Sequence, residues 1–202
     1  MSIFQNTCKP KGLGGKLMIK SMNSGHSQLH KWGITHIEIP QSGSIIDIGC
    51  GGGTNLKRFL DASKDARVYG IDYSELSAAK SSQLCKKEIK AGRCLVQVMD
   101  VLDITLPINT FSLATAFETI YFWKDLNKAF TNIHKILKED GKFLICNETN
   151  GRDSSQDKWV KIIDGMKIYS IDEIKESLLK AGFKKVEVDD SYKTWLTIIA
   201  TK

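Results

Sequence analysis

The sequence predicts an α/β fold with a seven-stranded, mostly parallel sheet, helices on both faces and a C-terminal antiparallel hairpin. Two observations predict it. From about residue 44 onward, short apolar runs alternate with amphipathic stretches, which is the pattern of βαβ units. Near the C-terminus, two apolar runs are joined by residues 189–193 only, and so short a link permits an antiparallel pair but no parallel crossover.

The elements follow in chain order from these patterns. Parallel strands are predicted at 44–48, 67–71, 94–99, 111–116 and 142–146, and the hairpin strands at 184–188 and 194–201. Helices are predicted at 55–62, 75–91, 126–137 and 172–181, with Ser74 as a cap and Gly141 and Gly182 as helix ends. Two further helical stretches, 14–22 and 26–37, precede the turn at Pro40 to Gly43.

Length and composition set the domain organisation. With 202 residues, the chain fits one domain. We expect a helical cap or lid at 1–42 and a cofactor-binding and catalytic core at 43–202. No apolar run approaches the ~18 residues that a bilayer span needs. The N-terminus also lacks the charged start and long apolar run of a secretion signal, so we expect a cytoplasmic protein with no membrane partner.

The cysteines argue against a disulfide framework and against a metal site. They are Cys8, Cys50, Cys85, Cys94 and Cys146, an odd and scattered set. None forms a C-x-x-C motif or lies near a paired histidine, so we expect free thiols and no metal.

The net charge of +6 raises the question of a nucleic-acid partner. Only four of the 29 basic residues are arginine, and lysine lacks the planar guanidinium that grips phosphates and base edges. The composition therefore argues against nucleic acid. One asymmetry leaves an RNA or protein substrate open as an alternative, because residues 1–37 contain five lysines and no acidic residue. The oligomeric state is not readable from the sequence.

The strongest functional signal is the segment 47–54, DIGCGGGT, which lies between the first predicted strand and the first following helix. Glycines at alternate positions allow sharp backbone turns and close approach to a ligand. The helix that begins near Thr54 directs free N–H groups to the same place. Asp72 ends the second strand, 23 residues after Gly49, where a βαβ unit places a carboxylate on ribose hydroxyls. Together these features favour an adenosine-containing cofactor.

The pattern Asp47, Gly49, Gly51, Gly53 resembles the first motif of the class I S-adenosylmethionine-dependent methyltransferases, an acid followed by x-G-x-G-x-G. The resemblance runs from about Ser44 to the C-terminal hairpin. It implies a Rossmann-like fold with six parallel strands and a seventh inserted antiparallel. It also implies S-adenosyl-L-methionine as the cofactor and methyl transfer as the reaction.

The resemblance assigns roles to further positions. Asp47 helps to place the methionine tail through the glycine loop. Asp72, with the neighbouring Tyr73, is the expected ribose-binding acid. Asp100 is expected to accept the adenine amino group, with Val101 as its backbone partner and Asp103 as the second choice.

The end of the fourth strand is expected to face the transferable methyl group. Phe117 is the expected cofactor contact there, and the catalytic candidates are Glu118, Tyr121 and the cap residue His26. A general base at Glu118 or a cap histidine is needed only if the acceptor must lose a proton. We expect one acceptor cavity to be lined by side chains from the N-terminal zone, the loop after this strand and the insertion 147–169. These side chains are His26, His30, Trp32, His36, Glu118, Tyr121, Trp123, Glu148, Trp159 and Tyr169.

Several departures from the family's branches shape the expected acceptor. No N-P-P-Y or D-P-P-Y motif follows the fourth strand, which argues against amino-group methylation of adenine or cytosine bases, and no Pro-Cys pair occupies that place, which argues against a cysteine-nucleophile mechanism at pyrimidine C5. We therefore expect transfer to an O, N or S atom of a small molecule by direct displacement. A nicotinamide-dependent oxidoreductase is a further alternative, but the third glycine of G-x-G-x-x-G and a Tyr-x-x-x-Lys pair are missing. A cofactor-binding module without catalysis also remains open.

Overall fold

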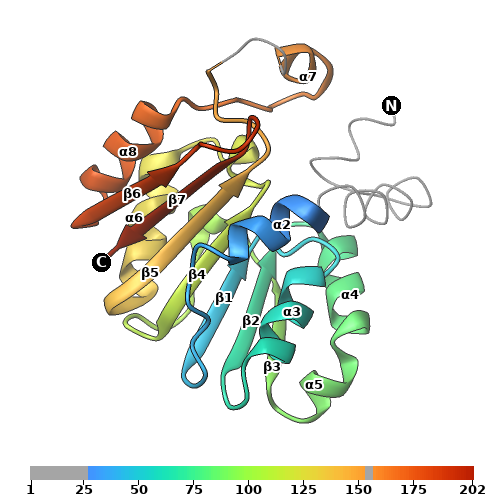
Figure 1. Ribbon diagram of the computed structural model, residues 1–202. Helices are drawn as coiled ribbons and strands as arrows, with labels where there is room; N and C mark the ends of the chain where they lie inside the picture. Colours follow the sequence, from blue (N-terminus) through green and yellow to red (C-terminus); the bar gives the residue numbers. More distant parts are fainter. Residues whose placement is uncertain (1–26, 153–156) are drawn as a thin grey trace.

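The computed structural model describes residues 27–152 and 157–202. Its centre is a seven-stranded sheet with the order β3-β2-β1-β4-β5-β7-β6 (Figure 1). The pairs β2–β3, β1–β2, β1–β4 and β4–β5 are parallel, whereas β7 is antiparallel to both β5 and β6. Only β7 therefore runs against the other strands, and the predicted topology is confirmed.

The strands lie where the apolar runs place them. Their bounds are Ser44–Ile48 for β1, Arg67–Asp72 for β2, Cys94–Val98 for β3, Phe111–Phe117 for β4, Leu137–Asn147 for β5, Lys185–Asp189 for β6 and Leu196–Thr201 for β7. The central strand β1 is buried almost throughout, because helices cover both of its faces.

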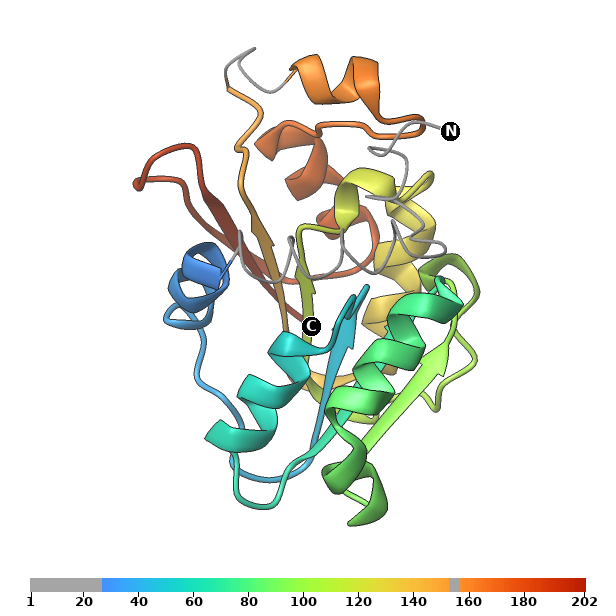
Figure 2. The ribbon, with the colours of Figure 1, turned by 90° about the vertical axis from the view of Figure 1, so that its right-hand side faces the viewer.

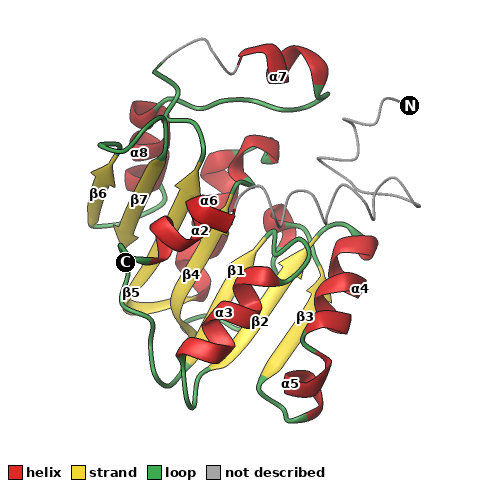
Figure 3. Cartoon of the chain, turned by 45° about the vertical axis from the view of Figure 1, so that its right-hand side comes forward, coloured by secondary structure: helices red, strands yellow, loops and turns green. Residues whose placement is uncertain are grey.

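Helices cover the two faces of the sheet (Figures 2 and 3). On one face lie α2 (Ser27–Ile34), α3 (Thr54–Ala62), α4 (Glu75–Leu84) and α5 (Lys86–Lys90). On the other face lie α6 (Leu126–Ile136) and α8 (Ile171–Lys180), together with the short 3₁₀ turn η2 (Val101–Asp103). The turn η3 (Ile120–Phe122) follows β4, and α7 (Asp157–Ile162) lies beyond the carboxyl end of β5 (Figure 1). No described helix is long and apolar enough to span a membrane.

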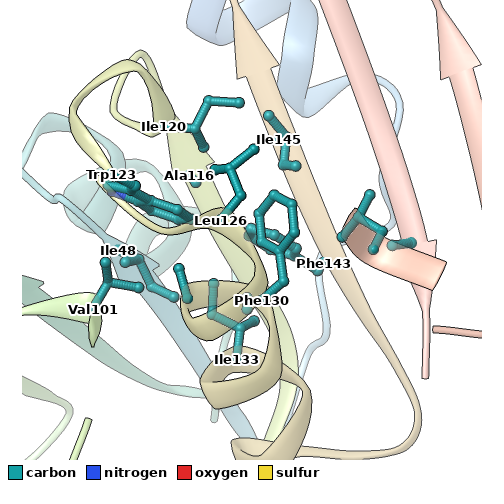
Figure 4. Packing of buried hydrophobic residues seen from close by; sticks show 14 of the residues in the cluster. Ile48, Val101, Ala116, Ile120, Trp123, Leu126, Phe130, Ile133, Phe143 and Ile145 are labelled. Atoms are coloured by element: carbon teal, nitrogen blue, oxygen red, sulfur yellow. The ribbon is translucent and has the colours of Figure 1, made fainter. Parts of the chain in front are cut away.

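Two hydrophobic clusters hold these layers together. On the α6 face, Phe130 packs edge-on against Phe143 of β5 with ring centroids 5.7 Å apart, and both side chains are fully buried (Figure 4). On the opposite face, Leu56 and Phe59 of α3 pack in a second cluster that includes Leu29 of α2. Burial of one such side chain stabilises a fold by about 1.5–3 kcal/mol, so both layers are integral to the domain.

The helix α2 belongs to this packed core. Leu29 is 2% exposed, and a Cβ on Gly33 would lie only 3.0 Å from Cβ of Cys146 and 3.1 Å from Cε1 of Phe117. The second predicted N-terminal helix, 26–37, thus forms over Ser27–Ile34. The predicted helix at 14–22 lies outside the described residues, and the lid over the active site stays a prediction.

Two local predictions need correction. The single helix predicted at 75–91 is interrupted at Cys85, whose backbone (φ −94°, ψ 19°) departs from helical geometry and separates α4 from α5. Gly141 does not end a helix, because α6 already ends at Ile136. Gly141 instead lies within β5, where a Cβ would come 2.8 Å from the Lys138 carbonyl oxygen. The glycine is needed for this close backbone approach. The predicted caps at Ser74 and Gly182 are present.

Candidate functional site

The glycine loop after β1 has the backbone that its sequence predicts. Gly49, Gly51 and Gly53 all have positive φ angles, of 74°, 55° and 82°. The amides of Gly49 and Cys50 both donate to the carbonyl oxygen of Ile71 at the end of β2, at 2.8 and 3.0 Å. The loop is therefore fixed to the neighbouring strand, and its left-handed residues favour glycine.

The three alternate glycines have different surroundings. A Cβ on Gly49 would collide with Oγ1 of Thr119, and one on Gly53 would lie 2.9 Å from Cα of Ser81. A Cβ on Gly51 would meet no atom of the described chain within 4 Å. Gly49 and Gly53 are thus required by packing, whereas Gly51 faces open space at the crest of the loop.

Asp72 connects this loop to the turn after β2. Its Oδ1 accepts a hydrogen bond from the amide of Ser74 at 2.8 Å, and its Oδ2 accepts one from the amide of Gly51 at 2.9 Å. Asp72 is 7% exposed, and this burial raises the pKa of its carboxyl group. The two amide donors favour the charged form and partly offset that effect.

A cavity of about 300 Å³ opens at the carboxyl ends of β1, β2 and β3, within the range of ligand pockets. Its walls are mostly apolar, with a few polar groups. The lining residues are Ile48, Gly49, Ile71, Asp72, Tyr73, Met99, Asp100, Val101, Leu102, Thr119, Phe122, Trp123 and Lys124. Four of the predicted cofactor residues besides Gly49 therefore converge here: Asp72, Tyr73, Asp100 and Val101.

Asp47 lies beneath the loop instead of in this cavity wall. It is 2% exposed, and Oγ1 of Thr115 on the adjacent strand β4 donates to its Oδ1 at 2.7 Å. Burial raises the pKa of Asp47 to about 7. The predicted role of Asp47, to help place the methionine tail of the cofactor through the glycine loop, is compatible with this position and stays a prediction.

A second polar cluster lies at the carboxyl ends of β4 and β5. Glu118 adopts a left-handed backbone with φ 56°. The hydroxyl of Tyr121 donates to its Oε1 at 3.2 Å, and the amide of Glu148 donates to the same oxygen. The amide of Thr149 donates to the Tyr121 hydroxyl oxygen at 3.3 Å. Burial raises the pKa of Glu118 to about 8 and that of Tyr121 well above its ordinary value.

In the described part of the chain, the residues named for a single acceptor cavity lie in more than one place. Trp123 lines the cavity described above, and Glu118, Tyr121 and Glu148 form the second cluster. Trp32 and His36 instead anchor α2 to the C-terminal hairpin. The Trp32 ring lies 5.5 Å from that of Trp195, and His36 Nε2 is 2.9 Å from Oδ2 of Asp189. Both side chains contact the hairpin, and their place in an acceptor cavity stays a prediction.

Two further predicted residues also lie away from the cavity lining. Phe117 is 6% exposed and faces α2, where its ring centroid is 4.9 Å from that of His30. Tyr169 packs beside the α6-face cluster and donates its hydroxyl to the carbonyl oxygen of Trp123 at 2.7 Å. His26 lies outside the described residues. The catalytic candidates that the structure brings together are therefore Glu118 and Tyr121.

Sequence reasoning missed several residues around the site. Thr115 and Thr119 support Asp47 and Gly49, and Met99 contributes to the cavity wall. Asn147 ends β5 and is 2% exposed, and its Oδ1 has no hydrogen-bond partner in the part of the chain that the structure describes. No local motif marks these residues, because their roles arise from the pairing of strands distant in sequence.

Comparison with known proteins bears on this site. Residues 46–145, about half of the chain, match a family model described as a methyltransferase domain. The chain is 26% identical over 137 residues to the uncharacterized methyltransferase YdaC of Bacillus subtilis, covering 68% of this chain and 74% of that protein. It is 25% identical to the O-methyltransferase cnsE of Penicillium expansum, covering 74% of this chain but only 55% of that protein.

Solved structures share the fold. Phosphoethanolamine N-methyltransferase 2 of Haemonchus contortus, solved in complex with S-adenosyl-L-methionine, superposes with a TM-score of 0.81 at 17% identity. That comparison covers 100% of this chain and 60% of the other. An S-adenosylmethionine-dependent methyltransferase structure from Methanococcus maripaludis gives a TM-score of 0.74 at 20% identity, covering 100% of this chain and 95% of the other.

Fold, glycine loop and family match define one class of protein. The chain belongs to the class I S-adenosylmethionine-dependent methyltransferases. Its cofactor is S-adenosyl-L-methionine, and this assignment replaces the nicotinamide alternative. The residues present fit that cofactor, because an apolar cavity with two carboxylates adjoins a loop whose crest, at Gly51, leaves room for a ligand.

Proposed function

We propose that the protein transfers a methyl group to an O, N or S atom of a small-molecule acceptor by direct displacement. The observation that carries the acceptor side of this proposal is the hydrogen-bonded pair of partly buried Glu118 and buried Tyr121, which lies just beyond the carboxyl end of β4. In open α/β sheets this edge is where ligands bind.

The cofactor side is assigned to the cavity at β1, β2 and β3. In this proposal Asp72 accepts hydrogen bonds from ribose hydroxyls, and Asp100 and the amide of Val101 bind the adenine edge; that all three residues line the cavity supports these roles. The apolar side chains of Met99 and Trp123 form walls against which a flat base can pack. The bound cofactor supplies a methyl group on a positively charged sulfur, which is already a good leaving group.

The residues of this chain then contribute positioning and, for acidic acceptors, proton removal. A general base works best when its pKa lies near the operating pH. Burial raises the pKa of Glu118 to about 8, so the carboxylate that can accept a proton from a hydroxyl, thiol or ammonium group is a minor form at neutral pH and becomes the major form above pH 8. The hydroxyl of Tyr121 and the amide of Glu148 hold the carboxyl oxygen Oε1 in place. Glu118 is therefore the proposed base, and Tyr121 orients it.

Relatives support a small acceptor. They include an O-methyltransferase, a sterol 24-C-methyltransferase of Kluyveromyces lactis and phosphoethanolamine N-methyltransferase 2 of Caenorhabditis elegans. The chain spans between a third and about half of the length of these proteins. Their acceptors differ in chemical class, so the common element is a small molecule and the acceptor atom is left open.

The test uses cofactor labelled in the methyl group. The protein is incubated with separate panels of phenols, thiols, amines, total RNA and total protein, and transferred label is measured in each. Label in a small-molecule panel that is lost in Glu118→Gln but kept in the surface variant Glu176→Gln is the expected result. Label confined to RNA or protein would overturn the small-molecule proposal and establish the alternative substrate class.

A further inference from the structure

Helix α4 packs directly against the glycine loop, and one of its side chains contacts the crest. Ser81 is fully buried, and its hydroxyl donates to the carbonyl oxygen of Gly51 at 2.8 Å. The Sγ of Cys50 lies 3.5 Å from the same hydroxyl oxygen. Ser81 lies 30 residues from Gly51 in sequence, outside the motif that marks the loop.

The two peptide groups that flank Gly51 are each hydrogen-bonded to a side chain. Asp72 accepts from the amide of Gly51, and Ser81 donates to its carbonyl oxygen. A hydrogen bond on each side leaves the backbone dihedral angles of Gly51 little freedom. Glycine adopts positive and negative φ angles about equally readily, so without these two bonds Gly51 would sample many conformations besides the observed φ of 55°.

The fit between Ser81 and the loop is also tight. A Cβ on Gly53 would lie 2.9 Å from both Cα and Oγ of Ser81, so the glycine and the serine are packed in contact. The same helix begins after Ser74, whose amide donates to Asp72. Helix α4 therefore fixes the loop through Ser81 and fixes Asp72 through its N-terminal end.

We propose that Ser81 is a positioning residue for S-adenosylmethionine binding. It does not contact the ligand. It holds the carbonyl group of Gly51 turned inward, so that the open side of this residue faces the ligand before the ligand arrives. A loop ordered in advance binds more tightly, because less conformational entropy is lost on binding. The inference rests on the family's cofactor and is independent of the proposed acceptor.

The test is calorimetric titration of the full chain with S-adenosylhomocysteine. Ser81→Ala removes only the hydroxyl, and alanine is a good helix former, so the helix is retained. The matched control is Ser82→Ala on the same helix, for which no hydrogen bond to the loop is present. We expect the dissociation constant to rise three- to tenfold in Ser81→Ala, as loss of one hydrogen bond implies, and to stay within twofold of wild type in Ser82→Ala.

Amide hydrogen exchange without ligand supplies the second measurement. In wild type, the amides of Gly51 and Gly53 should be protected, because both donate within the protein. Ser81→Ala should raise exchange in the loop while the strands keep their protection, which a general loss of stability would not do. If Ser81→Ala fails to fold, unprotected loop amides in wild type would overturn the proposal and protected ones would support it.

Two outcomes separate this inference from the assignment of the cofactor. If wild type does not bind S-adenosylhomocysteine, the cofactor assignment fails. If wild type binds and Ser81→Ala binds equally well, or Ser82→Ala loses as much, the positioning role of Ser81 is refuted and the cofactor assignment stands.

Discussion

Replacement of Glu118 by glutamine should change how the stability of the protein depends on pH. Burial raises the pKa of Glu118 from 4.5 to about 8 in the folded chain. Between these two values the folded state keeps a proton that the unfolded state has lost, so the free energy of unfolding falls as the pH rises. Glutamine keeps the shape and the acceptor oxygen but cannot ionise. The stability of Glu118→Gln relative to wild type should therefore increase with pH.

The magnitude follows from the size of the shift. The pKa of Glu118 rises from 4.5 to about 8, and the range from pH 5 to pH 8 covers most of the interval between these two values. A difference of one pKa unit corresponds to about 1.4 kcal/mol. The difference in unfolding free energy between variant and wild type should change by about 3 kcal/mol over this range. Asp47, whose pKa is also raised by burial, contributes equally to both proteins and cancels in the difference.

Urea unfolding at pH 5, 6.5 and 8 measures this difference, and coincident transitions by fluorescence and circular dichroism check that unfolding is two-state. The matched control is Glu176→Gln, whose carboxylate is exposed and forms an ion pair with Lys180 on the surface of α8. The unfolding free energy of that variant should differ from that of wild type by the same amount at all three pH values. If the unfolding free energy of Glu118→Gln also differs from wild type by the same amount at each pH, the raised pKa of the Glu118 carboxyl group is refuted.

Four further predictions concern the cofactor loop and its support. Gly51→Val places a branched side chain in the open space at the loop crest, so calorimetry should show no binding of S-adenosylhomocysteine while thermal unfolding still shows a cooperative transition. Gly49→Ala drives a methyl group into Thr119 and should lower the melting temperature; an unchanged value would contradict the packing described. Asp72→Ala should weaken binding of S-adenosylhomocysteine by about 1–3 kcal/mol, and nicotinamide dinucleotides should not bind wild type at all. Thr115→Val removes the hydroxyl donor to buried Asp47 and should cost about 1–3 kcal/mol of stability in urea unfolding at pH 8; a loss below 0.5 kcal/mol, of the size that surface changes give, would show that the hydrogen bond contributes little.

The sequence by itself determined most of the elements and the glycine loop on which the proposed cofactor site is centred. The predicted strands and helices mostly lie within a few residues of their positions in the structure. Asp72 and the glycines of segment 47–54 could be recognised because their role depends on local backbone geometry, namely a sharp turn between a strand and a helix. Such geometry is encoded by neighbouring residues, so a short motif is enough to show it.

Tertiary structure alone decided which side chains distant in sequence contact that site and which pack elsewhere. Ser81 and Thr115 contact the loop region only because α4 packs beside it and β4 pairs with β1. Trp32 and His36, predicted to line the acceptor cavity, pack against the hairpin because β7 pairs with β5 and brings Trp195 and Asp189 to α2. Contacts of this kind depend on the order of strands in the sheet, and no local pattern of residues specifies which side chain will meet which across it.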